Sequence, residues 1–198
     1  MPIDVLPFAT FAVVTNFTPG PNNITCAALG LSYGYRGALR FIVGIAAGFL
    51  ALMLTCAFLS GAVLALLPAA GAYVRWIGAA YILWLAWGVA RTDVQLEGRS
   101  GPARPLLTGA ALQFVNPKAW VYGLTIFSTF LLPLHDAPAL LAGVAVVLGL
   151  LTFTATSTWA MCGSTIGHHM KSPGLRRAVN GVLALLLVYT AAGLLGWV

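Results

Sequence analysis

The residues best suited to chemistry form one short stretch near the N-terminus, Phe17-Thr18-Pro19-Gly20-Pro21-Asn22-Asn23. Each proline removes a backbone donor and clashes with the preceding turn, so a helix cannot pass through this stretch intact. The amides that open a new half-helix after Pro21 would carry partial positive charge, which suits a carboxylate. The carbonyls freed before Pro19 and Pro21 could accept hydrogen bonds from an ammonium group. One break therefore offers both partners that an amino-acid zwitterion needs.

The two asparagines add side chains that can both donate and accept hydrogen bonds. An alternative role for Asn22 and Asn23 is to cap the new half-helix at its N-terminus. The two roles are compatible, and the sequence leaves both open. The predicted substrate-binding residues of this stretch are Thr18, Pro19, Gly20, Pro21, Asn22 and Asn23.

A second break is predicted at Asn116-Pro117-Lys118, inside another apolar run. Pro19 and Pro117 are separated by about half of the 198-residue chain, and interruptions at corresponding positions of two halves point to a transporter's substrate site. Lys118 is the one charged residue well inside a predicted span, so it could bind a substrate carboxylate or titrate during transport. Its alternatives are to snorkel from a shallow position or to pair with freed carbonyls. We add Asn116, Pro117 and Lys118 to the predicted substrate-binding set.

The composition restricts the class of protein. Hydrophobic residues make up 60% of the chain and charged residues only 7%, with a mean hydropathy of +0.94. Ordinary soluble domains contain about 25% charged residues, so the chain is predicted to be a polytopic α-helical membrane protein in a lipid bilayer. The net charge of +6 comes from a few basic residues in predicted loops, which indicates membrane topology and no nucleic-acid partner.

We predict an all-α fold of six transmembrane helices arranged as two inverted three-helix repeats, with helices 1 and 4 broken. The predicted spans cover approximately residues 5–31, 42–67, 71–90, 106–132, 139–167 and 178–198. The polar stretch 91–105 is the predicted cytoplasmic linker between a first repeat, residues 1–90, and a second repeat, residues 106–198. Residues 32–40 and 68–73 are predicted to be short turns.

Charge sets the predicted orientation. Most of the ten Lys and Arg residues fall in the first, third and fifth connections. The positive-inside rule places these connections in the cytoplasm, so both termini are predicted to be periplasmic. Because each half has three spans, the halves would enter the membrane in opposite senses, as inverted repeats do.

Two further patterns leave alternatives open. Aromatic residues at helical spacing in the third span are more often packing than pocket lining; Tyr81 and Trp84, with Gln113, are the possible pocket-lining residues. The small-xxx-small pattern from Gly44 to Gly48 could serve packing within one chain or a homodimer.

Several kinds of chemistry lack the residues they need. All four acidic residues fall in predicted loops or termini, so no carboxylate is predicted at mid-membrane to relay protons. Cys26, Cys56 and Cys162 lie far apart in apolar runs, and the histidines lack metal-site spacing. No phosphate-binding glycine loop and no credible nucleophile–base arrangement is present. We therefore predict no catalytic residues, no metal ligands and no cofactor, and a protein that is not an enzyme.

The motif TPGPNNI at residues 18–24, together with Asn116-Pro117-Lys118, resembles the LysE/RhtB amino-acid exporter family over essentially the whole chain. GAAYILWLAW (78–87), ALQFVN (111–116), STFLLP (128–133) and LALLLVY (183–189) are similar to its cysteine/O-acetylserine exporter branch. The resemblance implies a six-span exporter of small amino acids in the bacterial inner membrane, driven by the proton gradient. The alternatives are a membrane scaffold, which would not need two matching breaks, and an importer of small metabolites, since the gradients decide direction.

Overall fold

The computed structural model describes residues 5–91, 104–169 and 172–196, although the side chains of residues 59–75 and of a few others, including Tyr81, are not described. These three ranges contain helices and no strand. The helices are α1 (Val5–Phe17), α2 (Pro21–Arg91), α3 (Pro105–Val115), α4 (Pro117–Thr125), the π-helix η1 (Ile126–Phe130), the 3₁₀-helix η2 (Leu132–Leu134), α5 (Pro138–His169) and α6 (Pro173–Leu195). Both predicted breaks are confirmed, between α1 and α2 and between α3 and α4.

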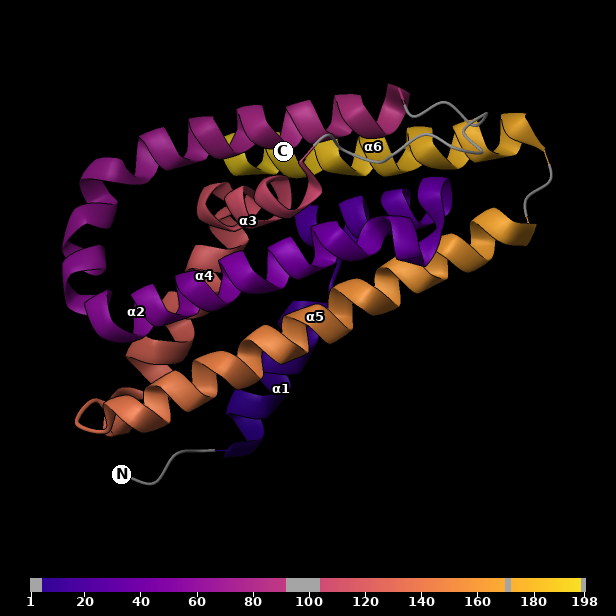
Figure 1. Ribbon diagram of the computed structural model, residues 1–198. Coiled ribbons are helices and arrows are strands. Elements are labelled where there is room, and N and C mark those ends of the chain that lie inside the picture. The colour runs from indigo at the N-terminus through magenta and orange to yellow at the C-terminus, as the bar shows by residue number, and fades with distance from the viewer. Residues whose placement is uncertain (1–4, 92–103, 170–171, 197–198) are drawn as a thin grey trace.

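Helix α2 keeps helical hydrogen bonding over 71 residues but is not straight. Gly34 has φ +71°, a conformation that favours glycine, and the chain reverses direction there. A second reversal, on the left of Figure 1, brings the helix back along the top of the molecule. We call residues 21–33, 35–58 and 76–91 the first, second and third runs of α2. The predictions of turns at 32–40 and 68–73 were wrong in that helix continues through both; one glycine at positive φ turns the chain at the first.

Each broken helix packs closely along a long helix from the other half of the chain. A Cβ added at Gly163 of α5 would lie 2.1 Å from the carbonyl oxygen of Ala27, in the first run of α2. A Cβ added at Gly44, in the second run, would lie 2.1 Å from the carbonyl oxygen of Leu106 in α3. Glycine is needed at both positions because the backbones leave no room for a side chain. The two halves of the sequence therefore interlock.

Buried apolar residues form two clusters, and the breaks lie between them. The first cluster includes Ile24, Phe41, Ile45, Ile82, Leu85, Leu112 and Leu187; the second includes Ala12, Phe49, Leu52, Met53, Ala119, Ile126 and Leu148. The chain passes from the second cluster to the first at the α1–α2 break. It passes from the first cluster to the second at the α3–α4 break, so the two breaks cross the boundary in opposite directions.

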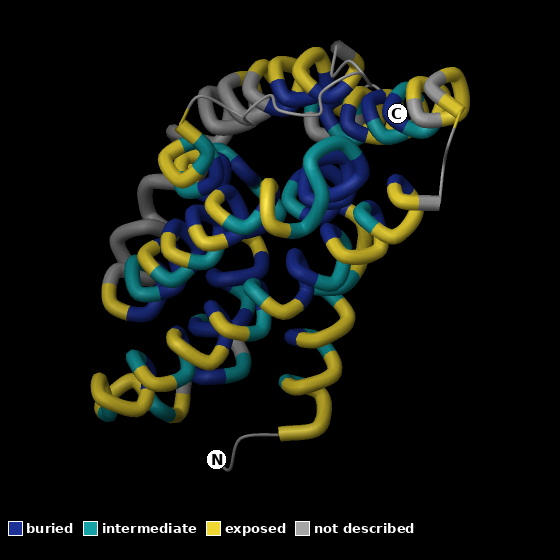
Figure 2. Tube along the Cα trace, turned by 45° about the vertical axis from the view of Figure 1, so that its right-hand side comes forward, coloured by how far each residue is buried: buried dark blue, intermediate teal, exposed yellow. Residues whose placement is uncertain are grey.

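The outer surface is apolar where a membrane would contact it. Figure 2 shows that buried residues face the inside of the bundle while exposed residues cover its outside. The exposed residues include large hydrophobic side chains on α5 and α6, such as Leu150 and Leu185. Within the described residues, Pro21–Phe58 and Pro138–His168 are long and apolar enough to span a bilayer, while Val5–Phe17, Pro105–Val115 and Arg177–Ala192 are shorter apolar helices. These features are those of an integral membrane protein.

Candidate functional site

The first break leaves Thr18, Pro19 and Gly20 outside any helix. The Thr18 carbonyl, freed by the prolines, accepts hydrogen bonds from Asn23 Nδ2 at 2.9 Å and from Lys118 Nζ at 3.1 Å. The carbonyl of Gly20 accepts the Ile24 amide at 2.9 Å, so that amide is not one of the free donors expected after Pro21. The Thr18 carbonyl is thus held by side chains from outside the break.

The second break is a single residue. Asn116 has an extended backbone, with φ −89° and ψ 104°, and it caps α4 by accepting the Lys118 amide at its Oδ1, at 3.1 Å. Asn22 and Asn23 were considered as caps of α2, but their side-chain hydrogen bonds go to Gln113 and to backbone carbonyls. Asn23 instead reaches backwards to the Thr18 and Asn16 carbonyls, the latter at 2.8 Å.

Amide side chains join the two breaks. Asn22 Nδ2 donates to Gln113 Oε1 at 2.9 Å, and Gln113 Nε2 donates back to Asn22 Oδ1 at 3.1 Å. The same Asn22 oxygen accepts Asn116 Nδ2 at 3.2 Å. Gln113 and Asn116 are buried, so water cannot readily replace these hydrogen bonds. We call Asn22, Gln113 and Asn116 the amide cluster.

Lys118 ties the second break to the first. Its Nζ donates to the Thr18 hydroxyl at 2.9 Å, to the Thr18 carbonyl at 3.1 Å and to the Pro19 carbonyl at 3.4 Å. All three acceptors are neutral oxygens, and no carboxylate of the described residues reaches the ammonium. Of the alternatives that the sequence left open for this lysine, pairing with freed carbonyls is the one observed.

Two cavities flank the breaks and share Gly20, Pro21, Asn116 and Lys118 as a common wall. The narrow cavity has a volume of about 30 Å³ and is also lined by Thr15, Asn16, Asn22, Asn23, Phe49, Ala119, Tyr122 and Thr152. The wide cavity has a volume of about 190 Å³ and is also lined by Pro19, Ile82, Pro117 and Thr190. The narrow cavity has room for about one water molecule. Only the wide cavity approaches the size of a small metabolite.

The structure brings the nine predicted substrate-binding residues to one place. Eight of them line one or both of these cavities, and Thr18 joins them through its bonds to Lys118. Gln113 belongs to the amide cluster beside them. Trp84 lies elsewhere, on the wall of a third cavity described below. The side chain of Tyr81 lies outside the described residues.

Three polar residues of the narrow cavity had escaped sequence reasoning. Asn16 Nδ2 donates to the Tyr122 hydroxyl at 2.8 Å, and Asn16 Oδ1 accepts the Thr152 hydroxyl at 2.7 Å. These bonds link α1, α4 and α5 on the far side of the breaks. The one available signal was a polar residue inside an apolar run, which Asn16 and Thr152 both are.

The arrangement suits binding of a small ion pair. It combines an ammonium, a set of backbone carbonyls and amides that both donate and accept. An amino-acid zwitterion needs partners of these two kinds. Among the described residues, no group of three or more His, Cys, Asp or Glu residues could hold a metal ion.

Comparison with known proteins identifies a family and named relatives. Residues 13–196 match the family described as LysE type translocator. A protein of Shigella flexneri serotype 5b (strain 8401), named cysteine/O-acetylserine efflux protein, is 40% identical over 190 residues, covering 96% of each chain. A protein of Escherichia coli (strain K12) with the same name is 40% identical over 184 residues, covering 93% of each chain. No solved structure matches the chain.

Proposed function

The chain belongs to the LysE type translocator family, and from that premise we propose that it exports cysteine, O-acetylserine or related small neutral amino acids across the bacterial inner membrane. The family and the names of its relatives support amino-acid export. One observation supports the location of the site. The two helix breaks meet at the Lys118 ammonium group, and the hydrogen-bond acceptors that it has among the described residues are neutral oxygens.

Lys118 stands where the ammonium group of a substrate would have to bind. The Thr18 and Pro19 carbonyls are the acceptors that the first break supplies, and Lys118 Nζ already uses them. We propose that the substrate ammonium replaces Lys118 at these carbonyls. The displaced lysine then pairs with the substrate carboxylate, so the full charges on both partners stay compensated in a medium of low dielectric constant.

The amide cluster is proposed to close the path between the two cavities. A small amino acid fits the wide cavity more readily than the narrow one, which holds about one water. Passage past the shared wall requires the narrow cavity to widen. Opening the reciprocal Asn22–Gln113 pair would widen it, and the substrate's own polar groups could then take over the freed amides.

We propose six spans in two inverted repeats, residues 1–90 and 106–198, joined by a cytoplasmic linker at 91–105. Helix α1 has 13 residues and is about 20 Å long, too short to cross a hydrocarbon core of about 30 Å without the first run of α2. The opposite directions in which the breaks cross between the apolar clusters support the inversion. Periplasmic termini remain the orientation that the positive-inside rule predicts.

Gly44 and Gly48 pack against α3 at Leu106 and Ala110, so this pattern serves packing within one chain. Proton coupling is proposed from the family resemblance. Import by the same site is the second candidate, because the amide cluster and Lys118 would bind substrate from either side.

Substrate-loaded proteoliposomes test the function. Efflux of cysteine, O-acetylserine, threonine and lysine is compared with and without a pH gradient. We expect cysteine and O-acetylserine to leave faster than lysine, and a gradient to accelerate them. Equal leakage of all four amino acids from protein-containing and empty vesicles would refute the proposal.

A further inference from the structure

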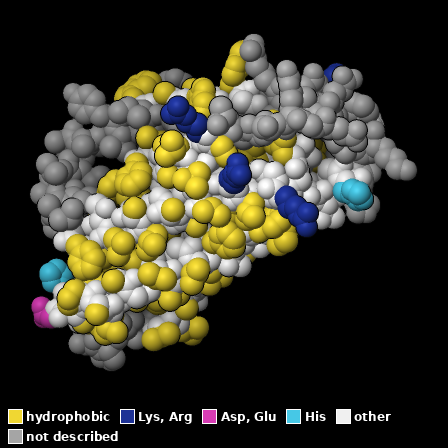
Figure 3. Space-filling model, viewed as in Figure 1, with side chains coloured by type: hydrophobic (Ala, Val, Ile, Leu, Met, Phe, Trp, Pro, Cys, Tyr) yellow, Lys and Arg dark blue, Asp and Glu magenta, His cyan; other side chains and the backbone are white. Residues whose placement is uncertain are grey.

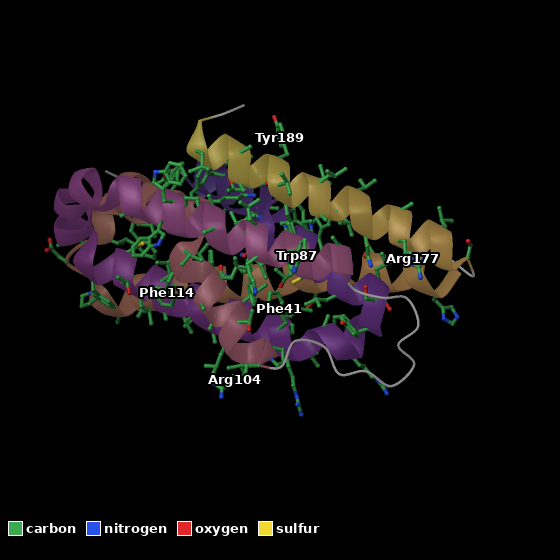
Figure 4. The ribbon with its side chains drawn as sticks, turned by 90° about the horizontal axis from the view of Figure 1, so that it is seen from above. Phe41, Trp87, Arg104, Phe114, Arg177 and Tyr189 are labelled. Atoms are coloured by element: carbon green, nitrogen blue, oxygen red, sulfur yellow. The ribbon has the colours of Figure 1, made fainter. Side chains whose placement is uncertain are left out.

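A third cavity lies away from the breaks, between the three runs of α2 and the start of α3. Its volume is about 270 Å³. It is lined by Thr25, Ala28, Leu29, Tyr33, Phe41, Trp84, Leu85, Trp87, Gly88, Val89 and Thr108. We call it the aromatic cavity because four of these residues are aromatic. Figure 4 labels Phe41 and Trp87 on neighbouring runs of α2.

The walls of the aromatic cavity do not suit an amino acid. None of the described residues that line it is charged, and their polar side-chain groups are three hydroxyls and two indole N–H groups. The Thr108 hydroxyl already donates to the Arg104 carbonyl at 2.9 Å. A zwitterion placed here would leave two full charges without charged partners, which is costly in a medium of low dielectric constant. An apolar ligand meets no such cost.

The cavity lies beside the outer surface of the bundle. Trp84 and Trp87, on its wall, are 56% and 59% exposed, and neighbouring Leu83 is 43% exposed. In a membrane protein, such apolar surface faces lipid. An acyl chain could therefore enter the cavity sideways from the bilayer.

Two arginines lie at one end of the helix pair that borders this cavity. The backbones of Gly44 and Leu106 touch, as do those of Gly48 and Ala110, so α3 and the second run of α2 run in the same direction. Arg40 and Arg104, which precede these contacts, therefore lie at the same end, and both are exposed.

Arg104 is also one helical turn before Thr108 of the cavity wall, and Arg40 adjoins Phe41. In Figure 4 Arg104 projects from the edge of the bundle, and Figure 3 shows Lys and Arg side chains among hydrophobic ones on one face. The positive-inside rule assigns this end to the cytoplasmic leaflet.

We propose that the aromatic cavity binds an acyl chain of an anionic phospholipid from the cytoplasmic leaflet, whose phosphate pairs with Arg40 and Arg104. Basic groups beside pockets between transmembrane helices are suited to anionic headgroups. The acyl chain fills the apolar cavity, and the two arginines select a lipid with a negatively charged headgroup. The proposal depends on membrane insertion and is independent of the transported substrate.

The test measures lipid binding by the full-length protein with phosphatidylglycerol whose acyl chains carry bromine, which quenches tryptophan fluorescence. Brominated phosphatidylcholine is the neutral comparison, and inorganic phosphate, which cannot quench, is added as a headgroup-only competitor. We expect quenching at lower concentrations of the anionic lipid than of the neutral one. Removing either arginine, as Arg40→Gln or Arg104→Gln, should weaken the anionic lipid about fivefold, the effect typical of one basic residue at a membrane surface.

A cavity-filling variant separates the acyl chain from the headgroup. A Cβ added at Gly88, on the cavity wall, meets no atom within 4 Å, so Gly88→Phe should fill the cavity without a backbone clash. Gly143→Phe on α5 is the matched control, since its Cβ also meets no atom within 4 Å. Gly88→Phe should lose most of the quenching and Gly143→Phe should keep it.

Equal quenching by both lipids in the wild type, or unchanged quenching in Gly88→Phe, would overturn the proposal. Recovery of tryptophan fluorescence by inorganic phosphate at concentrations as low as those of the lipid would overturn it as well, because the acyl chain would then contribute nothing to binding. The arginine variants still decide the question if Gly88→Phe does not fold.

Discussion

The two helix breaks look alike in sequence but are stabilised differently. At the α3–α4 break a single residue, Asn116, leaves the helix and caps the next one with its own side chain. At the α1–α2 break three residues leave the helix, and the Thr18 carbonyl depends on Asn23 and Lys118 for donors. The second break is therefore largely self-sufficient, whereas the first needs partners that a ligand can replace. We infer that the first break binds the substrate ammonium and that the second break supplies Lys118, the side chain that the substrate displaces.

The largest effect should come from removing the ammonium that serves the first break. Lys118→Met keeps the length of the side chain but leaves the Thr18 and Pro19 carbonyls without their cationic donor. We expect efflux from proteoliposomes to fall about 10- to 100-fold, the range for losing a charged hydrogen-bonding group. Arg36→Gln, which removes a positive charge from an exposed position of α2, serves as the control at equal protein level. Wild-type efflux by Lys118→Met would show that the two breaks do not communicate through this residue.

Steric displacement of the same lysine should have the next largest effect. A Cβ added at Gly20 would lie 3.2 Å from Lys118 Cδ and 3.3 Å from Lys118 Nζ. The lysine can move by a few tenths of an ångström, so Gly20→Ala should lower efflux only slightly. Gly20→Val adds bulk on the same side and should lower efflux about tenfold, as overpacking does. Equal efflux rates for Gly20→Ala and Gly20→Val would show that transport does not depend on the position of the Lys118 side chain. Gly143→Val is the control, because a Cβ at Gly143 meets no atom within 4 Å.

The breaks could be predicted from sequence, but their different means of stabilisation could not. Proline chemistry fixes where a helix stops, so Pro19, Pro21 and Pro117 were sufficient to place both interruptions. Which donor reaches which freed carbonyl depends on how segments about a hundred residues apart pack together. The sequence therefore left several roles open for Lys118, and the hydrogen bonds from its ammonium group to Thr18 decide between them.

The same limit explains what sequence reasoning missed on the far side of the breaks. Asn16, Tyr122 and Thr152 come from three helices and meet only in the folded chain. A single polar residue in an apolar span gives no periodic signal, so nothing marked them as partners. The helical state of residues 32–40 was missed because a glycine suggests a loop, while here the neighbours of Gly34 remain helical.

The amide cluster that joins the breaks provides a smaller effect. Gln113→Leu removes the two hydrogen bonds that the Asn22 side chain makes with Gln113. We expect the free energy of unfolding to fall by about 1–3 kcal/mol, measured by thermal or denaturant unfolding in detergent. The double variant Asn22→Leu/Gln113→Leu should recover part of that loss, because replacing both partners with apolar groups can be nearly neutral. Additive losses in the double variant would mean that the two amides do not interact as a pair.

The smallest effect should come from the self-capped break. Asn116→Ala removes the side-chain acceptor for the Lys118 amide, and loss of an N-cap costs about 1 kcal/mol. Asn116→Ser keeps a capping oxygen but lacks the Nδ2 donor to Asn22, so it separates capping from the amide cluster without burying a charge. If the second break is self-sufficient, Asn116→Ser should retain more stability than Asn116→Ala in the same unfolding assay. Both should keep more efflux than Lys118→Met, since the ammonium still reaches the first break. If Asn116→Ala lowered efflux as much as Lys118→Met, the two breaks would contribute equally to transport, and the proposed difference between a self-capped break and a ligand-binding break would be wrong.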